Sequence, residues 1–356
     1  MSELLTEATE HQPRARVALT AALATGPSHA YLFRGPRGAG KAAVARAFAA
    51  EILADGATDP DDARRRVLID PSPHPDLVWL RPRGAQHMVE EIRERVIRAS
   101  SYRPFEAEKR VFVIEAAEQM RDESQNALLK TLEEPPDFVH LILLTAEPSM
   151  LLETIASRCQ PIDFSPLPPE VVEARLSGAG SPEEIAAAAR LSAGDVDRAQ
   201  FLLSDSGREL RAAAIELESD WQKVLKAAES VGEEAEAATR DLLDEEAEAG
   251  VKRSAKDITD EAKRSGRRRR TETLDLALEL NASWFRDLAA TASGATDVVF
   301  NRDHLAALQS RAAALDPSRP RRAAELVQDT RRRLDLNVSE ELALEALAFR
   351  LERIFA

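Results

Sequence analysis

The residues with the clearest chemical potential form a glycine-rich loop that runs from Gly35 to Lys41. Glycines at 35, 38 and 40 let the backbone fold so that its amides converge on a phosphate, and Lys41 would reach the β and γ groups. The same residues also fit a plain glycine turn between a strand and a helix. The loop residues Gly35, Gly38, Gly40 and Lys41 are therefore candidate cofactor-binding residues, and nucleotide binding itself stays open.

Three positions at which such a site would hydrolyse nucleotide carry the wrong side chains. Ala42 stands where the loop pattern needs a Ser or Thr hydroxyl to hold Mg²⁺. Glu115 and Ala116 follow the apolar run 111–114, where an Asp would order the metal's water and a Glu would polarise the attacking water. Losing a general base alone typically costs about 10²–10⁴-fold in rate. Glu118 could replace it, or could be a solvated carboxylate at a helix start.

Arg158, in the short string Ser157-Arg-Cys159, is the candidate catalytic residue. A guanidinium is permanently charged and can meet phosphate oxygens as a planar fork. An arginine that one subunit inserts into the nucleotide site of another can contribute about 10³–10⁵ in rate. The alternative is an exposed arginine that stabilises a helix end. Thr145 ends a predicted strand and would either sense a γ-phosphate or cap that strand.

The elements that position these residues are short apolar runs separated by helical patterns. Strands alternating with helices indicate a parallel sheet covered on both faces. The glycine loop lies between the first strand and a helix over 42–53, as a phosphate loop requires. The predicted strands are Ala30–Phe33, Leu77–Leu80, Val111–Ile114 and Leu141–Leu144, with Pro161–Phe164 as an edge strand.

The strand-like runs largely stop after Leu167, and helical patterns follow. We predict three parts: an α/β P-loop domain at 1–166, a helical lid at 167–205 and an all-α domain at 206–356. Ser181–Glu184 and Asn337–Glu340 resemble capping boxes. Residues 205–265 favour one or two long helices, with Gly232, Gly250 and Gly266 as weak points. Leu4–Thr25 favours a single helix.

Composition limits the partners and the metals that the chain can bind. With 62 acidic and 48 basic side chains, the net charge is −14, so any DNA contact must be local or come from partners. The dense basic run Arg267–Arg270 could touch DNA or lie at a solvated helix junction. One cysteine excludes an internal disulfide and a multi-cysteine zinc site. No apolar run approaches the ~20 residues that span a bilayer, and we expect a cytoplasmic protein with no membrane contact.

Several strings occur in the order and spacing of one protein family. The N-terminal two hundred residues resemble the AAA+ clamp-loader ATPases, the machines that open a sliding clamp and close it on DNA. The proline-ended string Asn126–Pro136 is the most specific of the matches. The other matching strings are His29–Phe33, the loop Gly35–Lys41, His74–Leu77 and Ser157–Cys159.

The resemblance implies a subunit with an AAA+ domain, a lid and a helical collar that joins five chains. With the losses at Ala42, Glu115 and Ala116, it implies a non-hydrolysing stator that supplies Arg158 to a neighbouring ATPase during replication. The implied partners are gamma/tau and delta subunits in a hetero-pentamer, with the sliding clamp reached indirectly and primer-template DNA through the complex. No intrinsic ATPase or polymerase activity and no required cofactor are expected, and ATP or ADP binding stays open.

Two alternatives and one departure accompany this resemblance. The chain could be an ATP-hydrolysing gamma/tau-like motor subunit, or an unrelated AAA+ remodelling protein, but both would normally keep the hydrolytic residues. Many relatives carry a cysteine-bound zinc module after the loop helix. Residues 54–75 contain no cysteine here, so no zinc is expected, and Asp59–Arg66 is predicted as a tight loop in its place.

Overall fold

The computed structural model of the 356-residue chain describes residues 2–82, 86–248, 254–313, 315–334 and 338–355. Contacts divide the chain into two compact units, Met1–Leu167 and Pro168–Ala356. The predicted division into three parts stays a prediction. Within the described ranges, no helix is long and apolar enough to span a membrane.

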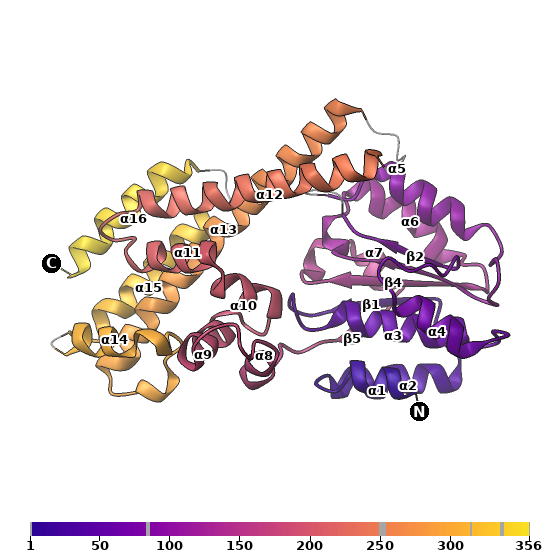
Figure 1. Cartoon of the computed structure of the whole chain (residues 1–356), viewed down its shortest axis with the longest axis horizontal. Helices are drawn as coiled ribbons and strands as arrows, with labels where there is room; N and C mark the ends of the chain where they lie inside the picture. The colour runs from indigo at the N-terminus through magenta and orange to yellow at the C-terminus, as the bar shows by residue number, and fades with distance from the viewer. Residues whose placement is uncertain (1, 83–85, 249–253, 314, 335–337, 356) are drawn as a thin grey trace. The chain divides into compact units, whose positions relative to one another are not determined.

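The first unit is built on a five-stranded parallel sheet with the strand order β2-β3-β4-β1-β5 (Figure 1). The predicted fold class, a parallel α/β sheet followed by a mostly helical region, is confirmed. All four predicted strands are present, and the predicted edge strand pairs with β1. The strands are β1 Ala30–Arg34, β2 Leu77–Leu80, β3 Arg110–Ile114, β4 Val139–Thr145 and β5 Gln160–Asp163.

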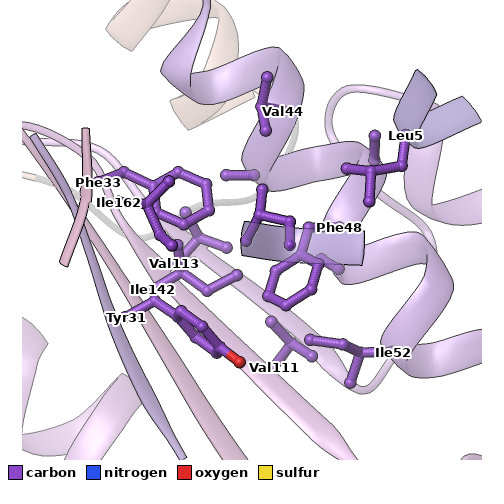
Figure 2. Packing of buried hydrophobic residues seen from close by; sticks show 14 of the residues in the cluster. Leu5, Tyr31, Phe33, Val44, Phe48, Ile52, Val111, Val113, Ile142 and Ile162 are labelled. Atoms are coloured by element: carbon purple, nitrogen blue, oxygen red, sulfur yellow. The ribbon is translucent and has the colours of Figure 1, made fainter. Parts of the chain in front are cut away.

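Both faces of this sheet are buried, which explains the near-continuous apolar runs of its strands. On one face Tyr31 and Phe33 of β1 pack with Phe48 of helix α3 (Lys41–Ala54), and the Tyr31 and Phe48 ring centroids lie 5.1 Å apart (Figure 2). Successive strand residues point to opposite faces. Leu32 therefore belongs to the other core, with Leu128 of helix α6 (Asp122–Glu133).

Helices cover the two faces of the sheet. In Figure 1, α2 and α3 lie on one side of it and α6 and α7 on the other. The helices of this unit are α1 Glu3–Ala8, α2 Pro13–Thr25, α3 Lys41–Ala54, α4 Pro60–Leu68, α5 Val89–Ile92, the π-helical η1 Arg93–Arg98, the 3₁₀ turn η2 Ala117–Gln119, α6 Asp122–Glu133, the 3₁₀ turn η3 Pro148–Met150 and α7 Glu153–Ala156.

Two local predictions in this unit are wrong. The single helix expected over 4–25 is broken into α1 and α2, because Pro13 lacks the N–H that would continue α1 and suits the first turn of a new helix. The tight loop expected over 59–66 is instead the start of α4. Asp59 caps that helix by accepting a 3.0 Å hydrogen bond from the Asp62 amide.

The described part of the second unit is formed mostly by helices. At its start, Ser181 and Glu184 form the predicted capping box of α9. Asn337, in the second predicted capping box, lies outside the described residues. The helices are α8 Pro169–Arg175, α9 Pro182–Leu191, α10 Val196–Leu203, α11 Asp205–Ile215, α12 Gln222–Glu248, α13 Ala255–Ala292, the 3₁₀ turns η4 Thr296–Val298 and η5 Arg302–His304, α14 Leu305–Ala312, α15 Ser318–Leu334 and α16 Glu340–Phe355.

Two of the predicted weak points are tight helix contacts instead. Gly232 lies inside α12 and Gly266 inside α13, and a Cβ added to Gly266 would lie 2.8 Å from the Gly232 carbonyl oxygen. The glycines therefore allow the two long helices to approach closely at the backbone, so they support the packing of this unit. Gly250 lies outside the described residues.

Candidate functional site

The glycine loop joins β1 to α3, as the sequence predicts. Gly35, Gly38 and Gly40 all have positive φ, at 152°, 68° and 83°. At Gly35 a Cβ would lie 2.3 Å from the carbonyl oxygen of Phe164, so any side chain there would displace the backbone that follows β5. Gly40, which precedes the first residue of α3, has a left-handed backbone conformation. The chain thus adopts a turn that only glycines allow at low cost.

Neighbouring strand ends hold this loop in place. The Gly35 amide donates to the Thr145 carbonyl of β4 at 3.2 Å. Gln12, which is buried between α1 and α2, donates through Nε2 to the carbonyls of Ala39 (3.0 Å) and Ser165 (2.7 Å). Its Oε1 accepts from the Ser165 amide at 2.9 Å. Gln12 was not predicted as a site residue, and its role depends on contacts between segments far apart in sequence.

Lys41 is folded back on the loop. Its Nζ donates to the carbonyls of Gly35 (2.5 Å) and Pro36 (2.6 Å), and the residue is only 9 % exposed. The ammonium is therefore solvated by the loop itself, and a phosphate would compete with these carbonyls for it. The adjacent Ala42 is exposed in the first turn of α3 and offers no oxygen to a metal.

Glu115 is held by protein donors at the end of β3. Its Oε1 accepts from Trp79 Nε1 at 2.7 Å, and both carboxylate oxygens lie 3.3 Å from Arg81 Nε. Arg81 also donates to Asp70 at 2.6 Å, and this hydrogen bond lowers the pKa of Asp70. The Arg46 guanidinium stacks 4.4 Å from the Trp79 ring centroid. The carboxylate in the metal position therefore already has cationic and neutral donors.

Ala116 supplies no general base and has a left-handed backbone, with φ 47° and ψ 53°. His87 supports this turn, because its Nε2 lies 2.7 Å from the Glu115 carbonyl oxygen, which can only accept. Nε2 therefore carries a hydrogen and donates it to this carbonyl, and burial lowers the pKa of the imidazole. His87 was not singled out in the sequence, since no local pattern indicates the contact.

The two remaining candidates near these strand ends have structural surroundings. Thr145 is buried, and its hydroxyl accepts a 3.1 Å hydrogen bond from the Glu147 amide, as the strand-cap alternative requires. Glu118 lies in the turn η2 and is half-buried. Its Oε2 is buried and has no hydrogen-bond partner among the described residues, so it is not the fully solvated carboxylate considered above.

Arg158 follows α7 and contacts the end of α6. Its Nη2 donates to Glu133 Oε1 at 2.7 Å, and its Nη1 donates to the Thr154 carbonyl at 2.9 Å. The side chain is 36 % exposed. The contact with the Thr154 carbonyl agrees with the alternative role of an exposed arginine that stabilises a helix end. Because part of the guanidinium stays exposed to solvent, it could also contact another molecule.

A buried amide fixes the segment that carries Arg158. Gln125 of α6 donates to the carbonyls of Met120 (2.9 Å) and Met150 (3.2 Å), and its Oε1 accepts from the Leu152 amide at 2.7 Å. Cys159, the residue after Arg158, is buried in the core that contains Leu128 of α6, and burial raises the pKa of its thiol to about 12. A thiol with that pKa is not a nucleophile at neutral pH.

The sheet separates the two groups of candidates. Ala39 of the loop belongs to the core on the α3 face, whereas Ile155 and Cys159, on either side of Arg158, belong to the core on the α6 face. The structure thus brings together the loop and the backbone of Thr145. It places Arg158 with Glu133, on the other face.

The basic run Arg267–Arg270 lies in the middle of α13, so the helix junction considered for it is wrong. Arg270 pairs with Glu340 at 2.6 Å, and Arg268 pairs with Glu272 at 3.0 Å. The Arg269 guanidinium lies 4.9 Å from the Phe201 ring centroid. Three of the four arginines therefore have partners within this unit.

Residues 11–168 match the protein family described as DNA polymerase III, delta subunit. DNA polymerase III subunit delta' of Bacillus subtilis is 35 % identical over 193 residues, covering 53 % of this chain and 58 % of that protein. The Pseudomonas aeruginosa subunit delta' is 36 % identical over 200 residues, covering 53 % and 60 %. The gamma/tau subunit of Mycobacterium tuberculosis H37Rv is 35 % identical over 157 residues, covering 42 % and 26 %. The chain spans less than two thirds of the length of each of these relatives.

Proposed function

We propose that the chain is a non-hydrolysing, delta-prime-type subunit of a clamp loader, because residues 11–168 match the DNA polymerase III delta-subunit family and two delta' subunits are 35 % and 36 % identical over about half of the chain. In this proposal it does not hydrolyse ATP itself. It presents Arg158 to the triphosphate of a neighbouring ATPase subunit while the sliding clamp is loaded onto DNA. The observation that carries the proposal is the contrast between a filled metal position at Glu115 and an exposed guanidinium at Arg158.

The chemistry of the nucleotide loop supports the first half of the proposal. Phosphoryl transfer relies on Mg²⁺ to neutralise charge and on a group that orients the attacking water. Ala42 and Ala116 lack the required oxygens, and the Glu115 carboxylate is hydrogen-bonded to Trp79 and Arg81. Lys41 and the glycine backbone would still offer donors to a phosphate. We therefore propose that any nucleotide bound there serves as a structural ligand.

The environment of Arg158 supports the second half. A finger must be charged, exposed and held at a defined position. The guanidinium is charged at all relevant pH values, and the Gln125 contacts fix the backbone from which it extends. The carboxylate of Glu133 holds the side chain by an exposed ion pair, which is weak enough for a triphosphate to replace.

The alternative is an ATP-hydrolysing motor subunit of the gamma/tau kind, and the sequence identity to such a subunit is similar. The residues at 42, 115 and 116 favour the non-hydrolysing subunit on chemical grounds, because Ala42 and Ala116 lack the oxygens that hold Mg²⁺ and orient the attacking water, and the Glu115 carboxylate is already hydrogen-bonded. The proposed partners are gamma/tau and delta subunits, with primer-template DNA reached through the complex. A cytoplasmic location follows from this role and stays a prediction.

The decisive experiment is reconstitution of the loader with its motor and clamp-opening subunits. We expect Arg158→Ala to leave assembly intact and to lower the DNA-stimulated ATPase rate, by up to about 10³–10⁵ at the site it completes. The matched control is Arg65→Ala, which removes another exposed arginine, paired with Asp62 on α4. An ATPase rate that is the same for both variants would remove the finger assignment.

The isolated chain provides the second test. We expect its Mg²⁺-dependent ATP turnover to be no greater than that of Lys41→Ala, because the metal ligand and the water-activating group are both replaced. Turnover clearly above that control would favour the motor alternative.

A further inference from the structure

A basic pocket lies in the second unit, between α15 and α16, far along the chain from the proposed sites. Its volume is about 670 Å³. Arg319 and Arg322 line it from α15, and Arg350 and Arg353 line it from α16. All four side chains belong to exposed residues. These arginines are not recognisable as a site from the sequence, because they come together only when the two helices pack.

The arginines of this pocket have few carboxylates near them; one is the exposed Asp316, whose pKa is lowered by hydrogen bonds from Ser318 and by the nearby Arg319. Within the described ranges, no ion pair joins any of the four to an acidic side chain. Arg319 donates only a long hydrogen bond of 3.5 Å to the Phe355 carbonyl, and Glu325 is the single acidic residue among the lining residues. In a chain with 62 acidic side chains, four guanidiniums without such partners around one hollow indicate an anionic ligand.

Helix stabilisation does not account for this arrangement. Cations are favourable at helix C-termini, which explains Arg353 in the last turn of α16. At helix N-termini they are unfavourable, yet α15 begins Ser318-Arg-Pro-Arg-Arg and has no acidic residue in its first turn. Arg319 therefore adds its charge to the positive end of the α15 dipole, although the Asp316 carboxylate, which accepts from the Ser318 amide at 3.0 Å, offsets part of it. With Arg322 one turn further on, the positive charge at this end of α15 attracts an anion.

The lining distinguishes among anionic ligands. Guanidinium forks match phosphate oxygens. Leu326 and Ile354 are the only large aliphatic side chains among the lining residues, so the pocket has little apolar surface with which to anchor a peptide side chain. A phosphodiester backbone needs only charge and hydrogen-bond donors. We propose that this four-arginine pocket binds the phosphate backbone of a nucleic acid.

Fluorescence anisotropy of the full chain with labelled oligonucleotides tests this proposal. We expect binding that weakens with salt, measured for a single strand and a duplex of equal length. Arg322→Ala/Arg350→Ala should lower the magnitude of the slope of log affinity against log salt by about 2, one for each phosphate that the variant no longer neutralises. The two nucleic acids show which form the pocket prefers.

The control is Arg321→Ala/Arg332→Ala, which removes the same charge from exposed positions of α15 outside the lining. It should keep the slope of the unaltered protein. Equal slopes in the two double variants would overturn the proposal, as would binding of polyglutamate with no binding of either oligonucleotide. Because the assay contains neither ATP nor motor subunits, its result does not depend on the role of Arg158.

Discussion

Arg158 and Glu133 form an ion pair, with 2.7 Å between Nη2 and Oε1, that joins the segment after α7 to the last residue of α6. Both side chains are substantially exposed, at 36 % and 50 %. An exposed pair of this kind contributes about 0–1 kcal/mol to stability. The pair therefore positions a guanidinium without being needed for folding.

We predict that Glu133→Gln changes the free energy of unfolding by less than about 1 kcal/mol, measured by urea denaturation. In the reconstituted loader it should reduce the ATPase rate less than Arg158→Ala does, because the guanidinium remains and only its ion pair is removed. A reduction as large as that of Arg158→Ala would mean that Glu133 itself acts at the neighbouring site.

Restoring the missing hydrolytic residues should not by itself restore hydrolysis. We predict that Ala42→Ser/Ala116→Glu has no ATP turnover above that of Lys41→Ala, because Trp79 and Arg81 still hold the Glu115 carboxylate. In addition, residue 116 has a left-handed backbone that is unfavourable for Glu. Steady-state turnover with Mg²⁺ checks this, and measurable turnover would show that the Glu115 contacts do not block the site.

The crossing of α12 and α13 should be sensitive to a single methyl group. We predict that Gly266→Ala lowers the free energy of unfolding by about 1–3 kcal/mol, because the new Cβ would meet the Gly232 carbonyl 2.8 Å away. The control Lys263→Ala places the same residue at an exposed position of α13 and should have little effect. Chemical denaturation of both variants makes the comparison, and equal midpoints would contradict the close packing.

The buried His87 should make stability depend on pH. Burial lowers its pKa from the ordinary 6.5, so the unfolded chain binds the proton more readily than the folded chain. Unfolding then takes up protons as pH falls below about 6.5, and the free energy of unfolding decreases. His74 and His140 have pKa values shifted in the same direction by burial.

We therefore predict that His87→Gln flattens the decline in stability between about pH 6.5 and 5, a window above the titration of the carboxylates. Denaturation curves across this range provide the measurement. The control is His304→Gln, at a histidine whose side chain is 43 % exposed, and a decline that is unaltered in His87→Gln would show that other groups cause it.

The sequence predicts the sheet well because its strands are buried on both faces and read as short apolar runs. The resemblance to the clamp-loader family, carried by strings such as Asn126–Pro136, is confirmed by the delta' and gamma/tau subunits that the N-terminal part matches. The break in the helix over 4–25 has a local cause, because Pro13 lacks the N–H that would continue α1. The side-chain hydrogen bonds of Gln12 to Ala39 and Ser165 are not predictable in this way, because they join segments far apart in sequence.

Site residues divide in the same way. The loop glycines are predictable because their backbone angles depend on residue type. The hydrogen bonds of Glu115 with Trp79 and Arg81 are not predictable, because the partners are 36 and 34 residues away in sequence. Helix propensity predicts weak points at the glycines of α12 and α13, because propensity alone does not show that Gly232 and Gly266 face each other.

Because the sheet lies between the loop and Arg158, substitutions near one of them should have little effect on the structure around the other. Side chains around Ala39 pack in one core and those around Cys159 in the other, and distant sites without shared partners behave nearly independently. A protein built this way can lose the machinery of one face by successive mutations while the opposite face keeps its shape. A single small domain can therefore lose activity at its loop and still keep the structure that positions Arg158.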